Sequence, residues 1–341
     1  MMLLAVLLSS VSLTLAAFSQ VVFEPEAATN SLLQLQLQLG KDSSAPEEES
    51  DDPADYWLSW CWDGHHPTDQ EFFLLHIGKV GGCSLVADLS KLVNRSRIWT
   101  QQGCYAMSRA GHFKKTFVML RRPRDLVLSM YHQCSWPGGP DSPEWHAMEE
   151  LGVAPGMPGN ILPDFATWVH TWSHDAPTED YVAKPFWNDK FHCNDPRDMM
   201  SRFLTCVNPV GHPPSINASD AIQQMKNSTA TGLLEAYHES ICLYAVELTG
   251  SLPSHCNCED AAAWSSFNET HITHDHTYND TIEDYNQAVL EDVDAISSAD
   301  RQLYRAGVQL FIHEMEKLES TFQVKVLCDE QREMLLEGIL S

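Results

Sequence analysis

A glycine turn between two apolar segments constrains the fold of this chain more than any other feature. Residues 72 to 89 read FFLLHIGKVGGCSLVADL. The segment EFFLLHI is short, apolar and partly aromatic, which predicts a buried strand. The segment SLVADLSKLVN has apolar residues at helical spacing, which predicts an amphipathic helix. Because glycine lets the backbone approach another group closely, Gly81 and Gly82 indicate a turn whose backbone lies against a ligand or another part of the chain.

The same alternation continues along the chain. The segment KTFVMLRRP predicts a second buried strand that ends before Pro123, and DLVLSMYHQC predicts the helix after it. TGLLEA and YHESICLYAVEL predict a third strand and helix, and two long helices follow near the carboxyl end. Strands that alternate with helices predict an α/β domain with a central parallel sheet and helices on both faces. Residues 135–190 are rich in Pro, Gly and Trp and predict an irregular insertion beside an acceptor site.

The amino-terminal 60 residues differ in composition from the rest. Residues 1–18 are apolar, with small residues at Ala16 and Ala17, and predict a cleaved signal peptide. An uncleaved membrane anchor is the alternative, although no Lys or Arg precedes Lys41. Residues 19–60 form a low-complexity acidic stem that lacks the apolar content of a core. We expect one folded domain over residues 61–341.

Two further patterns indicate the secretory pathway, with the Golgi lumen as the favoured location and secretion as the alternative. Ten cysteines suit an oxidising compartment. We expect Cys193 to pair with Cys206, and Cys242 to pair with Cys256 or Cys258. The CNC segment favours a disulfide over a metal site, because no second cysteine pair at zinc spacing accompanies it. Five N-x-[ST] sequons occur, at Asn94, Asn217, Asn227, Asn268 and Asn279.

The charge of the chain is strongly segregated. The formal net charge is −26, which argues against generic binding to nucleic acid or to an anionic membrane. Between Lys79 and Arg124, however, ten basic residues face one acidic residue, Asp88. This window predicts a site for a small anion, and a basic surface without a ligand is the alternative.

The two strand ends in this window suit two phosphate groups. The turn from Gly78 to Ser84 opens a helix, whose first N–H groups and positive dipole end can hold a phosphate, and Lys79 adds a charge. The motif GxxxxGK[ST] places its lysine after the glycines, whereas this turn places it before them, so a plain structural turn stays open as an alternative. Arg121 ends the second strand, and Ser129 follows it by two helical turns. Ligands of open α/β sheets lie beyond such strand ends.

At these residues the chain resembles a known family. HIGKVGGCSL and LRRPRDLVLSMY are similar to the two signature motifs of the lumenal carbohydrate sulfotransferases, roughly HIPKTGGTS and LRDPxxRxLSxY. GLLEAYHESICL and ADRQLYRAG are similar to two later family segments, in the same order. The chain departs from the family pattern at Val80, Cys83 and Arg122. The first two departures are tolerable because backbone N–H groups, rather than these side chains, would bind the phosphate.

The resemblance implies a P-loop-like three-layer domain that uses 3′-phosphoadenosine-5′-phosphosulfate as sulfuryl donor, without a metal. Lys79 and the turn would stabilise the leaving 5′-phosphate, and Arg121 with Ser129 would bind the 3′-phosphate. The donor-binding residues it implies are Lys79, Gly81, Gly82, Cys83, Ser84, Arg121 and Ser129. The acceptor would be a glycan or another hydroxyl-bearing molecule. The acidic surface favours a neutral or lightly charged acceptor over an anionic glycosaminoglycan.

An acceptor hydroxyl needs a general base. His112 is the predicted base, because it precedes the second strand and the family carries a GH histidine in that region. His132 is the next candidate and Glu235 a weaker one, whereas His76 is expected to be a core residue. THITHDHT contains three histidines that could bind a metal, His271, His274 and His276.

Two other functions remain open from the sequence. A lumenal binding protein with the same fold but without activity is the first, and the unusual KVGGCS segment is its best support. A P-loop-type kinase is the second, disfavoured by the order of lysine and glycines and by the lack of an evident magnesium-binding acidic strand end.

Overall fold

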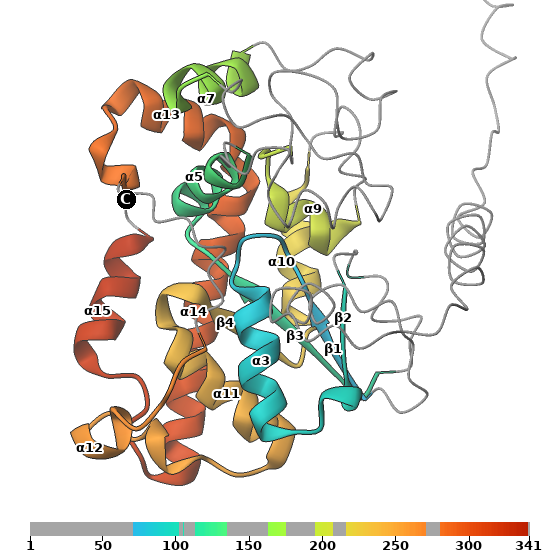
Figure 1. Ribbon diagram of the computed structural model, residues 1–341, viewed down its shortest axis with the longest axis vertical. Helices are drawn as coiled ribbons and strands as arrows, with labels where there is room; N and C mark the ends of the chain where they lie inside the picture. The colour runs from blue at the N-terminus through green and yellow to red at the C-terminus, as the bar shows by residue number, and fades with distance from the viewer. Residues whose placement is uncertain are drawn as a thin grey trace, which may run out of the picture. The chain divides into compact units, whose positions relative to one another are not determined.

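The core of the protein is a four-stranded parallel sheet with helices around it, an α/β arrangement (Figure 1). The computed structural model describes residues 71–101, 105, 113–134, 163–174, 195–206, 216–270 and 280–339. The strand order is β2-β1-β3-β4. The strands are β1 (Phe72–Leu75), β2 (Ile98–Gln101), β3 (Lys115–Leu120) and β4 (Ala230–Leu233).

β1 and β3 lie in the apolar runs that predicted them, and β4 overlaps the predicted strand TGLLEA, whose last three residues, Leu234–Ala236, form a 3-10 helix instead. β1, β3 and β4 end in buried residues, which is why their sequences lack the alternation of a half-exposed strand. β2 was not predicted, because its four residues IWTQ follow a turn of 3-10 helix directly and include two polar residues. It pairs with β1 from Phe72↔Ile98 to Leu75↔Gln101.

The strand order creates a point where the chain reverses direction across the sheet. From β1 the chain crosses to β2 on one side, whereas β3 lies on the other side of β1. β1 and β3 are neighbours, with Leu75 paired to Val118, so their carboxyl ends meet at one edge of the sheet. Ligands of open parallel sheets bind at such a switch point. This edge is therefore the first place to look for a functional site.

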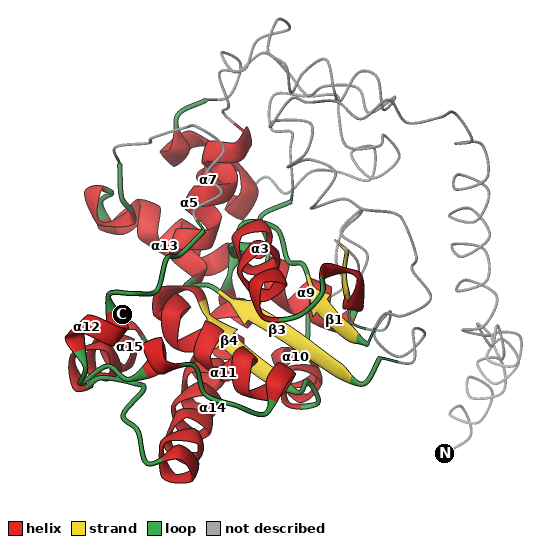
Figure 2. Cartoon of the chain, turned by 60° about the horizontal axis from the view of Figure 1, so that its bottom comes forward, coloured by secondary structure: helices red, strands yellow, loops and turns green. Residues whose placement is uncertain are grey.

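The helices pack around the sheet in groups (Figure 2). α3 (Gly82–Leu92) contacts α11 (Tyr237–Thr249), and α10 (Ala218–Lys226) contacts both α9 (Met199–Thr205) and α14 (Ser298–Phe322). The Tyr244 hydroxyl of α11 donates to the Val118 carbonyl of β3 at 2.7 Å. This bond ties α11 to the central strand.

A smaller apolar cluster joins α5 (Pro123–Cys134), α7 (Phe165–His174) and α13 (Gln287–Ile296). α7 corrects the prediction that residues 135–190 are an irregular insertion, because residues 165–174 are helical. Phe165, Trp168, Val169 and Trp172 follow the helical spacing and are buried against α13. Residues 135–162 and 175–190 of that insertion lie outside the described residues, as do residues 1–70.

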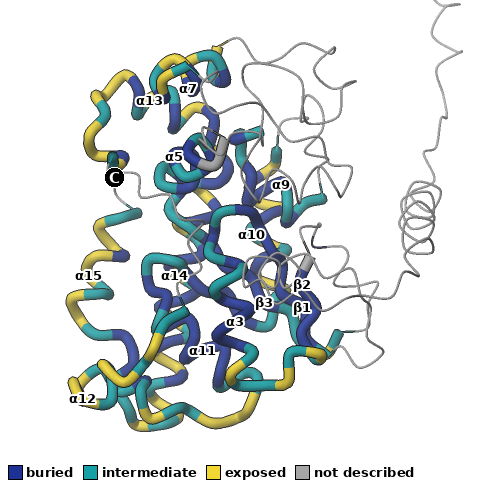
Figure 3. Tube along the Cα trace, in the orientation of Figure 1, coloured by how far each residue is buried: buried dark blue, intermediate teal, exposed yellow. Residues whose placement is uncertain are grey.

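The outer elements carry much of the exposed surface, whereas the strands are buried (Figure 3). The remaining elements are η1 (Arg95–Arg97), η2 (Leu234–Ala236), η3 (Ser254–Cys256), α12 (Ala261–Trp264), η4 (Ile282–Asp284) and α15 (Asp329–Gly338). None of the described helices has both the length and the apolar character needed to cross a membrane.

Disulfides fix the region around α11. Cys242 pairs with Cys256, which is one of its two predicted partners, and Cys258 pairs with Cys328 instead. Cys206 is also disulfide-bonded, while its predicted partner Cys193 lies outside the described residues. The asparagines of four sequons, Asn94, Asn217, Asn227 and Asn268, are exposed, and Asn279 is outside the described residues.

Candidate functional site

The turn between β1 and α3 leads, at the switch point, into a helix whose N-cap residue provides no capping side chain. Lys79 and Gly81 have positive φ angles, 63° and 78°, which reverse the chain within three residues. Gly81 is the N-cap of α3 and provides no side-chain hydrogen bond, and the first turn of α3 contains no acidic residue. The first N–H groups of a helix lack partners within it. The positive end of α3 is therefore not neutralised by its own first turn, which suits an anion.

Both glycines of this turn are required by close packing. A Cβ on Gly81 would lie 2.8 Å from Leu234 Cδ1, and its φ angle is unfavourable for other residues. A Cβ on Gly82 would collide with the ring of His76. His76 is buried, as expected for a core residue, and burial lowers its pKa to about 4. The His76 ring thus supports the start of α3 from inside.

Lys79 is a half-buried cation that has no counter-ion among the described residues. In the part of the chain that the structure describes, its ammonium group makes no hydrogen bond or ion pair. Burial and, to a smaller extent, the positive charge of Arg121 lower its pKa to about 8. Desolvation together with a like charge is the combination found where a protein receives a negative ligand.

Arg121 joins the two strand ends. It follows β3, and its Nη1 donates to the Lys79 carbonyl oxygen at 2.8 Å. Burial lowers the pKa of Arg121, while the carboxylates of Asp125 and Glu235 oppose that change. The structure therefore brings together two of the predicted phosphate ligands, Lys79 and Arg121.

The other predicted ligands stand in different positions. Ser129 lies on α5 and is partly exposed, and within the described residues no hydrogen bond joins it to Lys79 or Arg121. Ser84 is in the first turn of α3. Cys83 is in that turn too and is disulfide-bonded, so this departure from the family motif adds a covalent tether beside the glycines.

The neighbouring arginines are already paired. Arg122 Nε lies 2.7 Å from Asp125 Oδ2, and Arg124 donates to both oxygens of Asp294 at 2.9 and 2.8 Å. Arg122, Arg124, Arg301 and Arg305 line a hollow between α5, α14 and α15. Because Arg301 also pairs with Asp294, at 2.8 Å, Arg124 and Arg301 share one carboxylate, and the positive charge in this hollow is partly neutralised.

Glu235 has a structural task that conflicts with its predicted role as a base. Its Oε1 accepts from the Arg122 backbone N–H at 2.6 Å, and its Oε2 accepts from the Tyr304 hydroxyl at 2.9 Å. Both carboxylate oxygens thus hold the turn before α5. Burial raises the pKa of Glu235, although these hydrogen bonds oppose that change.

Among the described histidines, His132 is the one whose pKa responds to the charges of Lys79 and Arg121. It lies on α5, one turn after Ser129, and its Nε2 is 3.2 Å from Asp280 Oδ1. Burial lowers the pKa of His132; Asp280 raises it, and the charges of Lys79 and Arg121 lower it again. Tyr285 donates to the other Asp280 oxygen at 2.5 Å. A neutral imidazole beside a carboxylate can accept a proton. His112, the predicted base, lies outside the described residues.

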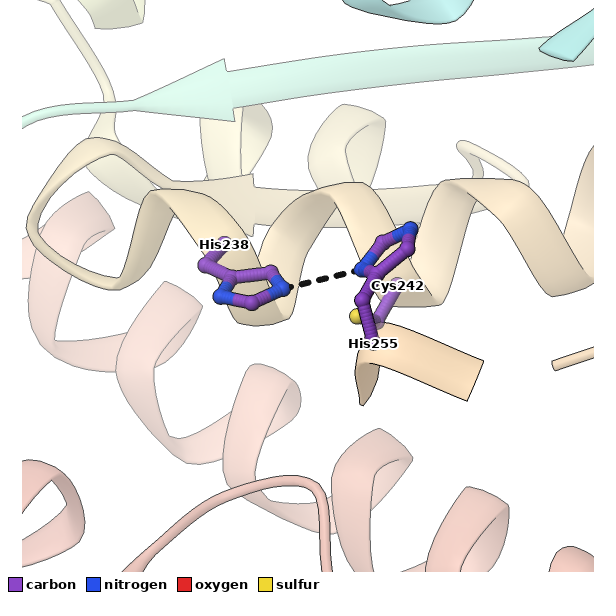
Figure 4. Close-up of side chains that lie close together, drawn as sticks. All are labelled: His238, Cys242 and His255. Carbon is purple, nitrogen blue, oxygen red and sulfur yellow. Dashed lines mark hydrogen bonds between the residues drawn. The ribbon is translucent and has the colours of Figure 1, made fainter. Parts of the chain in front are cut away.

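A second group of histidines joins α11 and η3 (Figure 4). His238 and Cys242 on α11 face His255 of η3, with His238 Nε2 3.0 Å from His255 Nδ1. Cys242 forms a disulfide with Cys256 and offers no thiolate. His238 also stacks on Phe267, with ring centroids 4.1 Å apart. This group is a packed structural cluster. The histidines of THITHDHT lie outside the described residues.

Sequence reasoning missed the Asp280 and Tyr285 partners of His132. No local motif links them to His132, because they belong to a distant part of the chain. Comparison with models of known protein families, with curated proteins and with solved structures found no match.

Proposed function

We propose that this protein is a sulfotransferase that moves a sulfuryl group from 3′-phosphoadenosine-5′-phosphosulfate to an acceptor hydroxyl. The observation that carries the proposal is the pair of cations at the switch point. Lys79 has no counter-ion in the described part of the chain, and its carbonyl oxygen accepts a hydrogen bond from Arg121. In this proposal the parallel sheet belongs to a P-loop-like three-layer domain. The protein works in the lumen of the secretory pathway, and its acceptor is a neutral or lightly charged glycan.

The residues take the following parts in the proposed reaction. The acceptor oxygen attacks sulfur in line, and the bond between sulfur and the 5′-phosphate oxygen breaks. Negative charge then grows on the leaving phosphate. Lys79 and the N–H groups at the start of α3 stabilise that charge, and Arg121 with Ser129 binds the 3′-phosphate. The acceptor proton passes to a histidine.

Two histidines compete for the part of base. The family resemblance favours His112, and proximity to Lys79 and Arg121 favours His132. The variants His112→Asn and His132→Asn, each assayed across pH, separate them. Loss of the acidic limb from the residual activity in one variant identifies the base.

The proposal is tested by turnover with sulfur-labelled donor and a panel of neutral glycans, with Lys79→Ala as the matched control. Labelled glycan with the wild-type chain but not with Lys79→Ala supports a sulfotransferase. Tight binding of 3′-phosphoadenosine-5′-phosphate without any turnover indicates an inactive binding protein. Stabilisation by ADP with magnesium, and none by the 3′-phosphorylated nucleotide, indicates a kinase.

A further inference from the structure

Two histidines one helical turn apart converge on a single carboxylate at the junction of α7 and α13. His170 Nδ1 lies 2.9 Å from Asp292 Oδ2, and His174 Nδ1 lies 3.4 Å from Asp292 Oδ1. The three possible ligand atoms are all within 4.8 Å of one another. The spacing i, i+4 places both imidazoles on one face of α7, where their rings stack with centroids 4.1 Å apart.

An apolar cluster packs α7 against α13 and so fixes the positions of these side chains. Trp168 and Trp172 on α7 are buried in the same apolar cluster as Val289 and Val293 of α13. Ser173 adds a polar support, because its hydroxyl donates to Asp292 Oδ1 at 2.7 Å. The carboxylate is thus held in a fixed orientation, as a ligand of a cation requires.

The contrast with the His238 cluster shows why this one can take an ion. His238 lies against Phe267, and its sulfur neighbour Cys242 is locked in a disulfide. Burial and the neighbouring His255 lower the pKa of His238 to about 4. By contrast, the side chains of His170 and His174 are 59% and 56% exposed, so an ion from solvent can reach them.

We propose that His170, His174 and Asp292 form a site for a divalent transition-metal cation such as Zn²⁺. The ion binds Nδ1 of each neutral imidazole, whose single proton is then on Nε2, and one carboxylate oxygen completes three protein ligands. Two imidazoles and a carboxylate suit Zn²⁺, Cu²⁺ or Ni²⁺ better than Mg²⁺ or Ca²⁺. Water occupies the remaining coordination positions. The bound ion links α7 to α13, independently of the proposed sulfuryl transfer.

The test is a calorimetric titration with Zn²⁺ of the full chain after treatment with a chelator. The background is the variant His271→Gln/His274→Gln/His276→Gln, which removes the other histidine-rich segment. In that background we expect His170→Gln/His174→Gln to abolish one zinc-binding event. Ser173→Ala should weaken the same event about 10-fold, the scale for loss of a group that orients a ligand.

The control variant is His313→Gln, which removes an exposed histidine from α14 and should leave the titration unchanged. Co²⁺ provides a second readout, since its visible absorption reports imidazole and carboxylate coordination and should disappear with His170→Gln/His174→Gln. The proposal is overturned if that double variant binds Zn²⁺ with wild-type stoichiometry and affinity. It is also overturned if the background variant binds no zinc, or if Mg²⁺ competes at equal concentration.

Discussion

Two strand-to-helix turns lie side by side at one edge of the sheet, and they treat positive charge differently. The β1–α3 turn (residues 76–81) contains Lys79, which has no ion pair among the described residues, and leads into a helix without an acidic first turn. The β3–α5 turn (residues 121–122) leads into a helix whose first turn contains Asp125, which pairs with Arg122. The first turn leaves the charge of Lys79 available, whereas in the second turn Asp125 pairs with Arg122 and a carbonyl oxygen holds Arg121.

The difference assigns separate tasks to the two turns. A cation without a partner in a low-dielectric site interacts strongly with a charge that develops during a reaction. A cation held by hydrogen bonds is better suited to position a charge that stays constant. The β1–α3 turn therefore suits the leaving 5′-phosphate, and Arg121 of the β3–α5 turn suits the 3′-phosphate.

The largest effect should come from removing the available charge. We expect Lys79→Ala to lower turnover about 10²- to 10³-fold, the scale for loss of one preorganised donor to a developing charge. Thermal unfolding should show a folded protein, because the variant removes a desolvated charge and no hydrogen bond of that ammonium among the described residues. Turnover close to wild type would end the distinction between the two turns.

The next effect concerns the second turn. Arg121→Ala should weaken the binding of 3′-phosphoadenosine-5′-phosphate by about 10- to 100-fold, since a hydrogen bond to a charged group contributes roughly 1.5–3 kcal/mol. The affinity for adenosine 5′-phosphate, which lacks the 3′-phosphate, should fall much less. Ser129→Ala should show the same selectivity with a smaller loss. Equal losses for the two nucleotides, measured by calorimetry, would place the 3′-phosphate elsewhere.

A third prediction uses pH. The folded-state pKa of Lys79 is about 8, below its ordinary value, so the lysine loses its proton as pH rises through 8. An anion binds the protonated form, and nucleotide affinity should fall about tenfold between pH 7 and pH 9. Lys79→Arg keeps its charge over that range and should remove the fall. A fall that persists in this variant would assign the titration to another group.

The smallest effect should come from a neutralised charge. Arg124 is paired with Asp294, so Arg124→Gln should change nucleotide affinity less than about twofold and stability by about 1 kcal/mol or less. Titration and thermal unfolding of the same sample measure both quantities. A loss of affinity as large as that of Arg121→Ala would show that the paired arginines also bind the ligand.

The sequence predicted the parts of the fold in which local pattern and burial agree. The apolar runs placed β1, β3 and β4, and Pro123 correctly marked the end of β3, although it is also the first residue of α5. β2 was missed, because four residues with two polar members do not form a periodic pattern. α7 was missed although Phe165, Trp168, Val169 and Trp172 follow helical spacing, because the surrounding glycines and prolines dominated the interpretation.

The residues of the candidate site likewise include some that the sequence predicted and some that it did not. Lys79, Gly81, Gly82 and Arg121 were predictable, because parallel strands bring their carboxyl ends to one edge. The ion-pair partners were not, since Asp280 and Asp294 come from distant segments that only folding brings to α5. The engagement of Glu235 by Arg122 and Tyr304 likewise depends on tertiary contacts.

The central claim is that the two turns together hold a nucleotide with phosphates at both its 5′ and 3′ positions. The most direct measurement is a calorimetric titration of the wild-type chain at pH 7, with a chelator present, comparing 3′-phosphoadenosine-5′-phosphate with adenosine 5′-phosphate. We expect the first nucleotide to bind at least about tenfold more tightly, because Arg121 adds a charge-assisted contact to its 3′-phosphate. Equal affinities, or no binding of either nucleotide, would contradict the account.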